Sequence, residues 1–134
     1  MGTEVNIEIW EDADRQSPVA EFLDNIPKSD SVRITKKLER CEERTFQEFF
    51  AQGDSFIEKI NTNTDTTLYE VKFKGKGAYN YRAIGFRHGA DFVILTLFHG
   101  SGSKGVVHRH VPSALERARV WESTHPMSWS RTET

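Results

Sequence analysis

The stretch LYEVKFKGKGAYNYRAIGF, residues 68–86, decides the fold because it holds two strand-like segments joined by a glycine-rich turn. Apolar and polar side chains alternate through it, which is the two-residue period of a β-strand. A third segment, FVILTLF at 92–98, is apolar throughout, as expected of a strand covered on both faces. The short links between the segments predict antiparallel hairpins, with strands over 68–75, 79–87 and 91–99.

Helical patterns precede and follow this strand-rich region. Apolar side chains repeat at helical spacing over 17–27 and again over 30–53, and a proline-started helix is predicted over 111–123. Short strands are predicted over 5–10 and 56–60. Because helices and strands fall into separate runs, the sequence predicts an α+β fold in which a small antiparallel sheet packs against helices.

The length of 134 residues predicts a single domain, which we expect to cover 1–124, followed by a flexible tail over 125–134. No run approaches the roughly 18 apolar residues of a transmembrane helix, and the acidic N-terminus does not resemble a secretory signal. Cys41 is the only cysteine, so no internal disulfide or cysteine-bound zinc is expected, and its place on an apolar stripe indicates a core residue. These features predict a cytoplasmic protein without a membrane span, a metal or a cofactor.

Charge is distributed unevenly along the chain, although the formal net charge is only −2. Residues 1–67 carry 8 Lys and Arg against 15 Asp and Glu, whereas residues 68–110 carry 7 against 2. The second segment also holds four of the five histidines. A basic segment in an acidic chain is expected when one surface meets phosphate groups. The alternative is a chance clustering of charge on an exposed hairpin.

Lysines mark one face of the first strand of the hairpin. Lys72 and Lys74 share this face, and Lys76 continues the alternation, while the apolar side chains between them face the core. Across the turn, Arg82 and Ile84 lie two residues apart and therefore share a strand face. We expect the side chain of Arg82 to be partly buried, with the planar N–H groups of its guanidinium held in an orientation suited to a phosphate. The pattern therefore predicts a positively charged surface that binds a phosphodiester.

Histidines near the basic hairpin are candidates for proton transfer. In RNA, the ribose 2′-hydroxyl can attack the adjacent phosphate without a metal if a base, an acid and cations assist. His99, His108 and His110 supply imidazoles, which as a class exchange protons near neutral pH. Each of them can also be a solvated or structural residue.

The pattern over this region resembles the HigB-like, phage-derived branch of the RelE/ParE toxin superfamily. The resemblance covers about residues 5–124 and is strongest over 68–100. It implies a RelE-like fold and the toxin of a type II toxin–antitoxin system, which cuts mRNA on the ribosome without a metal. It also implies a cognate antitoxin, a small DNA-binding protein that is often of the helix-turn-helix type. The residues that carry the resemblance are Leu68, Glu70, Lys72, Phe73, Tyr81, Arg82, His99, Gly100, Lys104, Pro112, Ala118 and Arg119.

The resemblance implies roles for individual residues as well. Arg82 is expected to stabilise the charge of the phosphorane, Lys72 to share that charge, and His108 to transfer the proton. RNA contacts are expected of six further residues, which are Lys74, Lys76, Arg87, His99, Lys104 and Arg109.

Two other functions are compatible with the same fold. A non-enzymatic binder, such as a ParE-type poison of DNA gyrase or an inhibitor of another host target, would use the helical segment 31–52 as an acidic docking face. A toxin that has lost its activity would survive as an interaction module. The sequence SGSKGVV at 101–107 motivates this last alternative, because HigB-like relatives usually have a phenylalanine and paired lysines there.

Overall fold

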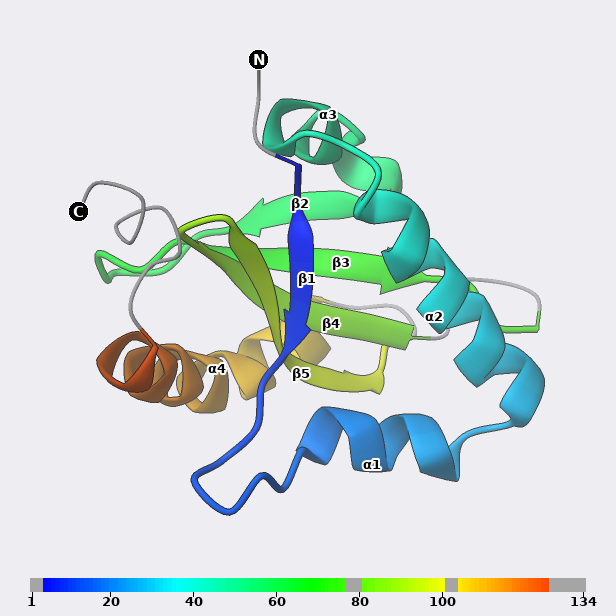
Figure 1. Ribbon diagram of the computed structural model, residues 1–134, viewed down its shortest axis with the longest axis horizontal. Coiled ribbons are helices and arrows are strands. Elements are labelled where there is room, and N and C mark those ends of the chain that lie inside the picture. The colour runs from blue at the N-terminus through cyan, green and yellow to red at the C-terminus, as the bar shows by residue number, and fades with distance from the viewer. Residues whose placement is uncertain (1–3, 77–80, 101–103, 126–134) are drawn as a thin grey trace.

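The described residues form a five-stranded mixed sheet in this computed structural model (Figure 1). The structure describes residues 4–76, 81–100 and 104–125. The strand order is β1-β5-β4-β3-β2, and β2 to β5 pair antiparallel while β1 runs parallel to β5. The bounds are β1 Asn6–Ile9, β2 Ile57–Ile60, β3 Leu68–Phe73, β4 Tyr81–His88 and β5 Asp91–His99.

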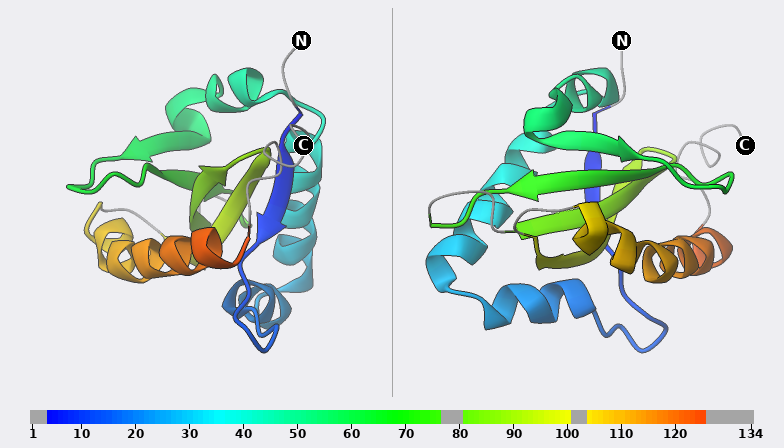
Figure 2. Two further views of the ribbon diagram at one scale, coloured as in Figure 1. Left: turned by 60° about the vertical axis from the view of Figure 1, so that its left-hand side comes forward. Right: turned by 180° about the vertical axis from the view of Figure 1, so that it is seen from behind.

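Helices cover both faces of this sheet (Figures 1 and 2). On one face lie α1 (Pro18–Asn25), α2 (Lys28–Cys41) and α3 (Phe46–Phe50), and on the other lies α4 (Lys104–Thr124). The α+β class predicted from the sequence is confirmed. The prediction of an antiparallel sheet is wrong at the edge formed by β1. A parallel pair joins segments far apart in the chain, so no local turn signal marks it.

The second predicted helix is divided in two. α2 ends at Cys41, and α3 begins after Thr45, whose hydroxyl accepts a hydrogen bond from the backbone N–H of Glu48. The carboxylate of Glu48 in turn accepts a hydrogen bond from the backbone N–H of Thr45, and these contacts lower the pKa of Glu48. This capping box begins a new helix, so the continuous helix predicted over 30–53 is wrong in its middle.

The last helix begins earlier than predicted. α4 starts at Lys104 and contains Pro112 in its interior. A proline has no N–H, so the carbonyl of His108 loses its usual helical partner at this point while the helix continues. Because proline often begins a helix, the sequence predicted a start at residue 111, and this prediction is wrong since the helix begins at Lys104.

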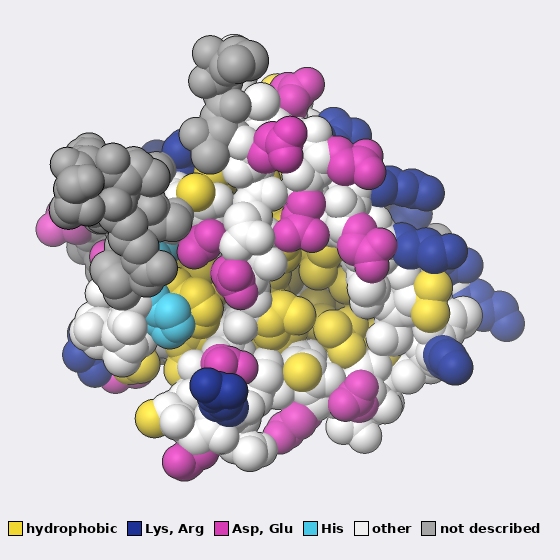
Figure 3. All heavy atoms as spheres, in the orientation of Figure 1, with side chains coloured by type: hydrophobic (Ala, Val, Ile, Leu, Met, Phe, Trp, Pro, Cys, Tyr) yellow, Lys and Arg dark blue, Asp and Glu magenta, His cyan; other side chains and the backbone are white. Residues whose placement is uncertain are grey.

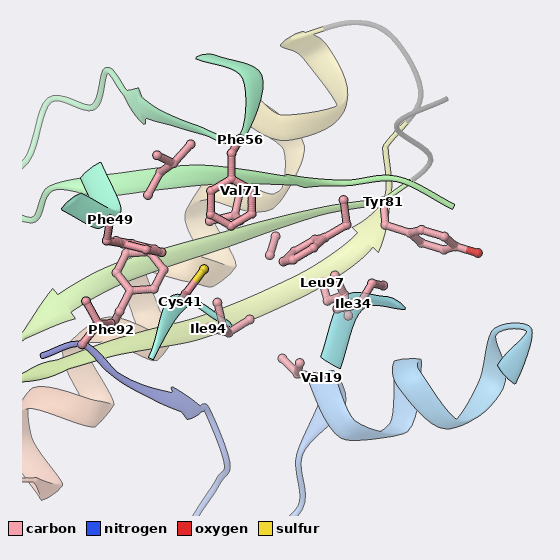
Figure 4. Packing of buried hydrophobic residues seen from close by; sticks show 14 of the residues in the cluster. Val19, Ile34, Cys41, Phe49, Phe56, Val71, Tyr81, Phe92, Ile94 and Leu97 are labelled. Atoms are coloured by element: carbon pink, nitrogen blue, oxygen red, sulfur yellow. The ribbon is translucent and has the colours of Figure 1, made fainter. Parts of the chain in front are cut away.

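Two apolar clusters hold the layers together. The first lies between the sheet and α1–α3 and includes Phe49 and Phe92 (Figure 4). The second lies under α4 and includes Leu95 and Ala118. Cys41 is buried in the first cluster, which confirms it as a core residue, and burial raises the pKa of its thiol.

A buried hydrogen bond ties α2 to the start of β4. Tyr81 Oη donates to Asp30 Oδ2 over 2.6 Å, and both side chains are buried. The bond to the carboxylate, together with burial, raises the pKa of Tyr81 from 10.0 to about 12. The folded state therefore favours the neutral phenol. This preference stabilises the fold below pH 10 and is lost as the pH rises through about 12.

Replacing Tyr81 with Phe removes this hydrogen bond. We expect Tyr81→Phe to lower the free energy of unfolding by about 1–3 kcal/mol at neutral pH, because the buried carboxylate of Asp30 loses its donor. The difference between the variant and the wild type should shrink as the pH rises above 10, where the phenol starts to ionise in the unfolded chain. Urea unfolding over this pH range measures both effects, and a difference that stays constant with pH would contradict the raised pKa.

Candidate functional site

Lys72 and Arg82 are direct neighbours on β3 and β4. Their Cα atoms are register partners in the antiparallel pair. Lys72 lies four residues after Leu68 and Arg82 two residues before Ile84, so both share the sheet face of the apolar cluster under α4. The structure thus brings together the two cations that the sequence placed on either side of the turn.

Arg82 is held by two acceptors. Its Nη1 forms an ion pair with Oε2 of Glu70, and its Nε donates to the carbonyl oxygen of Gly100 over 2.8 Å. The side chains of Arg82 and Glu70 are 14% and 8% exposed, so the pair is largely removed from water. The predicted partial burial of Arg82 is confirmed. A guanidinium held at two points presents its planar N–H groups in one orientation.

Gly100 is required for this arrangement because Arg82 packs directly against it. A Cβ atom at position 100 would lie 2.4 Å from Cγ and 2.7 Å from Cδ of Arg82. Those distances are far below van der Waals contact, so a larger residue would displace the arginine stem. The glycine after the apolar strand therefore helps to set the position of the guanidinium.

Lys72 has a carboxylate partner of its own. Its Nζ lies 3.5 Å from Oε2 of Glu58 on β2, and its side chain is 16% exposed. Two cations and two carboxylates therefore interleave over three adjacent strands. Sequence reasoning did not assign Glu58 or Glu70 to the site. The available signal was the position of Glu70, which shares a strand face with Lys72 two residues later.

His108 reaches the same place from α4. Glu58 and Glu70 from the sheet and Val107 and His108 from α4 line a hollow of about 120 Å³. His108 is exposed, so it is open to a ligand at this hollow. Lys72 and Arg82 do not line this hollow themselves, but each pairs with a carboxylate that does, Glu58 and Glu70 respectively. We call the following five residues the β3–β4 cluster: Glu58, Glu70, Lys72, Arg82 and His108.

The lysines after Lys72 do not continue its row. β3 ends at Phe73, where its pairing with β4 also ends, so the alternation of a strand does not hold beyond it. Lys74 instead lines a hollow beside α2, and Lys76 is exposed beyond the strand end. The predicted strand over 68–75 is therefore too long, and the lysine row stops at Lys72.

Arg87 and His99 lie on the opposite face of the sheet from Arg82. The guanidinium of Arg87 packs 3.7 Å from the ring centre of Phe46 in α3. The ring of His99 packs 5.1 Å from that of Phe22 in α1. Strand alternation separates His99 from the cluster, and a register shift after Ile84 accompanies the placement of Arg87. These two predicted RNA contacts are not brought to the β3–β4 cluster.

The remaining predicted residues lie in the first part of α4. Arg109 is exposed, and Lys104 begins the helix, although its side chain lies outside the described residues. His110 stacks on Phe98 with 3.9 Å between ring centres. Burial, with smaller contributions from Arg109 and Arg117, lowers the pKa of His110. His110 is thus a packing residue, and its surroundings favour the neutral imidazole.

A second hollow, which we call the α2 cleft, lies between α2 and the end of β3. Its volume is about 370 Å³, and none of its lining residues is acidic. Figure 3 shows Lys and Arg side chains gathering on the right-hand side of the molecule, where α2 lies in Figure 1. The helical segment 31–52, expected to offer an acidic docking face, instead presents a basic one here. The lining residues are Arg33, Lys36, Lys37, Arg40, Ser55, Phe56, Lys72, Phe73 and Lys74.

Neither a metal centre nor a membrane span is evident in the ranges that the structure describes. Within 4–76, 81–100 and 104–125, no three His, Cys, Asp or Glu side chains gather as ligands of one metal ion would. No helix of that part of the chain combines the length and apolar character needed to cross a membrane.

Comparisons with known proteins give no assignment. No protein-family model matches the chain, and no curated protein matches it significantly. The candidate function therefore rests on the residues and the geometry described above.

The ion pair of Arg82 with Glu70 should be strongly coupled. We expect Glu70→Ala to lower the free energy of unfolding by about 3–5 kcal/mol, because it leaves a buried charge without its partner. The double variant Glu70→Ala/Arg82→Ala should lose less than the sum of the single variants, with a coupling energy of about 1–3 kcal/mol. Urea unfolding of the four proteins of this double-mutant cycle measures the coupling.

The exposed pair of Glu116 with Arg119 on α4 provides the matched control. Its side chains are 61% and 68% exposed, so the same cycle there should give a much weaker coupling than the buried pair, because water screens the charges. Equal coupling in the two cycles would show that burial adds nothing to the pair of Arg82.

Proposed function

We propose that this protein is the toxin of a type II toxin–antitoxin system and acts as an endoribonuclease that cuts mRNA on the ribosome without a metal. The observation that carries the proposal is the β3–β4 cluster, where Lys72 and Arg82 lie side by side and His108 borders the adjoining hollow. RNA cleavage by the ribose hydroxyl needs cations and a proton-transfer group, and the cluster offers both. The resemblance of the sequence to HigB-like members of the RelE/ParE superfamily supports the same activity.

In the proposed reaction, the 2′-hydroxyl of the nucleotide before the cut attacks the adjacent phosphorus. The new bond from the 2′-oxygen forms while the bond to the 5′-oxygen of the next nucleotide breaks, which leaves a 2′,3′-cyclic phosphate and a 5′-hydroxyl. Arg82, with Lys72 beside it, stabilises the added negative charge on the phosphoryl oxygens. A base takes the proton of the 2′-hydroxyl, and an acid gives a proton to the leaving 5′-oxygen. His108 serves one of these two transfers, a role suited to an imidazole, and water serves the other.

Glu70 acts in this proposal as a positioning residue. It holds Nη1 of Arg82 while the carbonyl of Gly100 holds Nε, so the guanidinium is oriented before a phosphate arrives. Preorganised donors lower the cost of stabilising charge in a transition state, because they need not reorient during the reaction. The buried pair therefore serves the reaction through Arg82.

The proposed activity sets the partners and the location of the protein. Its substrate is mRNA bound to the ribosome, which places its action in the cytoplasm. A cognate antitoxin, a small DNA-binding protein of the helix-turn-helix type, silences it by covering the basic site. The described contacts of the chain itself support the cationic site, and the antitoxin enters through the resemblance of the sequence.

One observation favours a second candidate, a non-enzymatic binder on the same fold. Lys72 and Arg82 both have carboxylate partners, as expected also of ion pairs with a purely structural role. Such a protein would inhibit a host target, for instance DNA gyrase, without cutting RNA. Double-strand DNA breaks with intact mRNA after expression would favour this candidate.

Arg82→Ala tests the proposed mechanism. We expect this variant to cut mRNA on programmed ribosomes about 100- to 1,000-fold more slowly than the wild type, because the developing charge loses a preorganised donor. Mapping of the cut sites by primer extension measures the rate and should locate the wild-type cuts in A-site codons.

Arg119→Ala is the matched control, since it removes an arginine from α4 whose side chain is 68% exposed. This control should cut at the wild-type rate. Circular dichroism should show that both variants are folded. Wild-type cleavage by folded Arg82→Ala would remove Arg82 from the mechanism.

A further inference from the structure

The α2 cleft concentrates positive charge without acidic neighbours in its lining. Arg33, Lys36, Lys37 and Arg40 project from α2 at the spacing i, i+3, i+4 and i+7, which places them on one helix face. The row spans about 10 Å along the helix axis, from the rise of about 1.5 Å per residue. Among the residues that the structure describes, no ion pair joins Lys36, Lys37 or Arg40 to a carboxylate. Like charges in one concave site repel each other and attract a polyanion.

Two contacts fix the walls of the cleft. Arg33 Nη1 donates to the carbonyl oxygen of Gly75 over 2.8 Å and lies 3.9 Å from the carboxylate of Asp30, which ties α2 to the chain after β3. Lys37 Nζ lies 4.5 Å from the ring centre of Phe56, which holds the lysine stem against the floor. The cleft is therefore a built feature of the packing between α2 and the sheet.

The α2 cleft is connected to the β3–β4 cluster through one shared residue. Lys72 lines the cleft and also forms the ion pair with Glu58, and Glu58 lines the hollow that contains His108. The end of β3 thus lies between the two hollows, because Lys72 lines one and its partner Glu58 lines the other. A chain of phosphates that passes over this strand end can contact both.

We infer that the α2 cleft binds the phosphate backbone of single-stranded RNA next to the bond that the β3–β4 cluster cuts. This inference rests on the proposed function for the identity of the polyanion. The lining favours RNA over an acidic protein segment, because protein interfaces usually centre on apolar anchors in exposed pockets. The two aromatic residues of the cleft, Phe56 and Phe73, are each only 3% exposed, so neither ring forms an open pocket for an apolar anchor of a protein partner.

Binding to a single-stranded RNA of 2′-O-methyl nucleotides tests the inference. Such RNA cannot be cut by its own 2′-oxygen, so the assay does not depend on catalysis. Fluorescence anisotropy of the labelled oligonucleotide with the full chain, over a range of salt concentrations, gives the affinity and its salt dependence. We expect Lys36→Gln/Arg40→Gln to bind at least tenfold more weakly at low salt, and its slope of log affinity against log salt to be shallower by about 1.4.

The matched control removes the same two charges elsewhere, in Lys28→Gln/Arg119→Gln. Both of these residues are exposed and lie outside the cleft. This control should keep the salt slope of the wild type within about half a unit, because neither charge meets the backbone in the cleft. Thermal unfolding should show that both double variants are folded.

Three outcomes decide the matter. Equal affinities and slopes in the cleft variant and the control would overturn the inference. Binding of polyglutamate as tight as that of RNA, with the same loss in the cleft variant, would assign the cleft to an acidic protein and also overturn it. Cleft-dependent RNA binding by Arg82→Ala, which tests no cleavage, would support the cleft even if ribosome assays rejected the nuclease activity.

Discussion

The buried ion pair between Arg82 and Glu70 is the constraint on which the functional interpretation depends. It joins β3 to β4 on the face under α4, with both side chains mostly removed from water. Burying two charges is costly, and a well-packed apolar pair can often replace a buried ion pair without loss of stability. A role in orienting the guanidinium gives a physical reason for keeping the pair, because Glu70 and Gly100 together fix the plane of Arg82.

The strand end at Phe73 organises the rest of the site. Before it, Lys72 is the register partner of Arg82, and its ammonium pairs with Glu58, which lines the hollow beside His108. After it, Lys74 leaves the strand and joins the cations of α2. One short segment therefore contributes to both hollows. The positive charge predicted for the hairpin is therefore divided between the β3–β4 cluster and the α2 cleft, and Lys72 belongs to both.

Local patterns in the sequence were sufficient for most of the fold. The period of two along 68–86 predicted β3 and β4 and placed Arg82 on the covered face, and the apolar run at 92–98 predicted β5, because both patterns are local properties of the chain. The parallel pairing of β1 with β5 could not be read in this way, since it joins distant segments. The break between α2 and α3 was readable in principle, because Thr45 and Glu48 have the spacing of a capping box.

The candidate site was only partly predictable for the same reason. Arg82, Lys72 and His108 were found because each belonged to a recognisable local pattern. Arg87 and His99 were misplaced because charge along a segment does not indicate the face of the sheet on which a side chain lies. The α2 cleft was not predicted because its cations come from two segments that are distant in the sequence, so no local pattern marks it.

The central claim is that the ribose 2′-hydroxyl of the mRNA is the attacking group at the β3–β4 cluster. The most direct measurement is cleavage on programmed ribosomes of an mRNA with a single 2′-deoxy nucleotide at the mapped cut site, beside the all-ribose mRNA. The account predicts that the all-ribose mRNA yields a 2′,3′-cyclic phosphate and that the single substitution abolishes the cut at that position. Cleavage of the 2′-deoxy mRNA at an unchanged rate would contradict it.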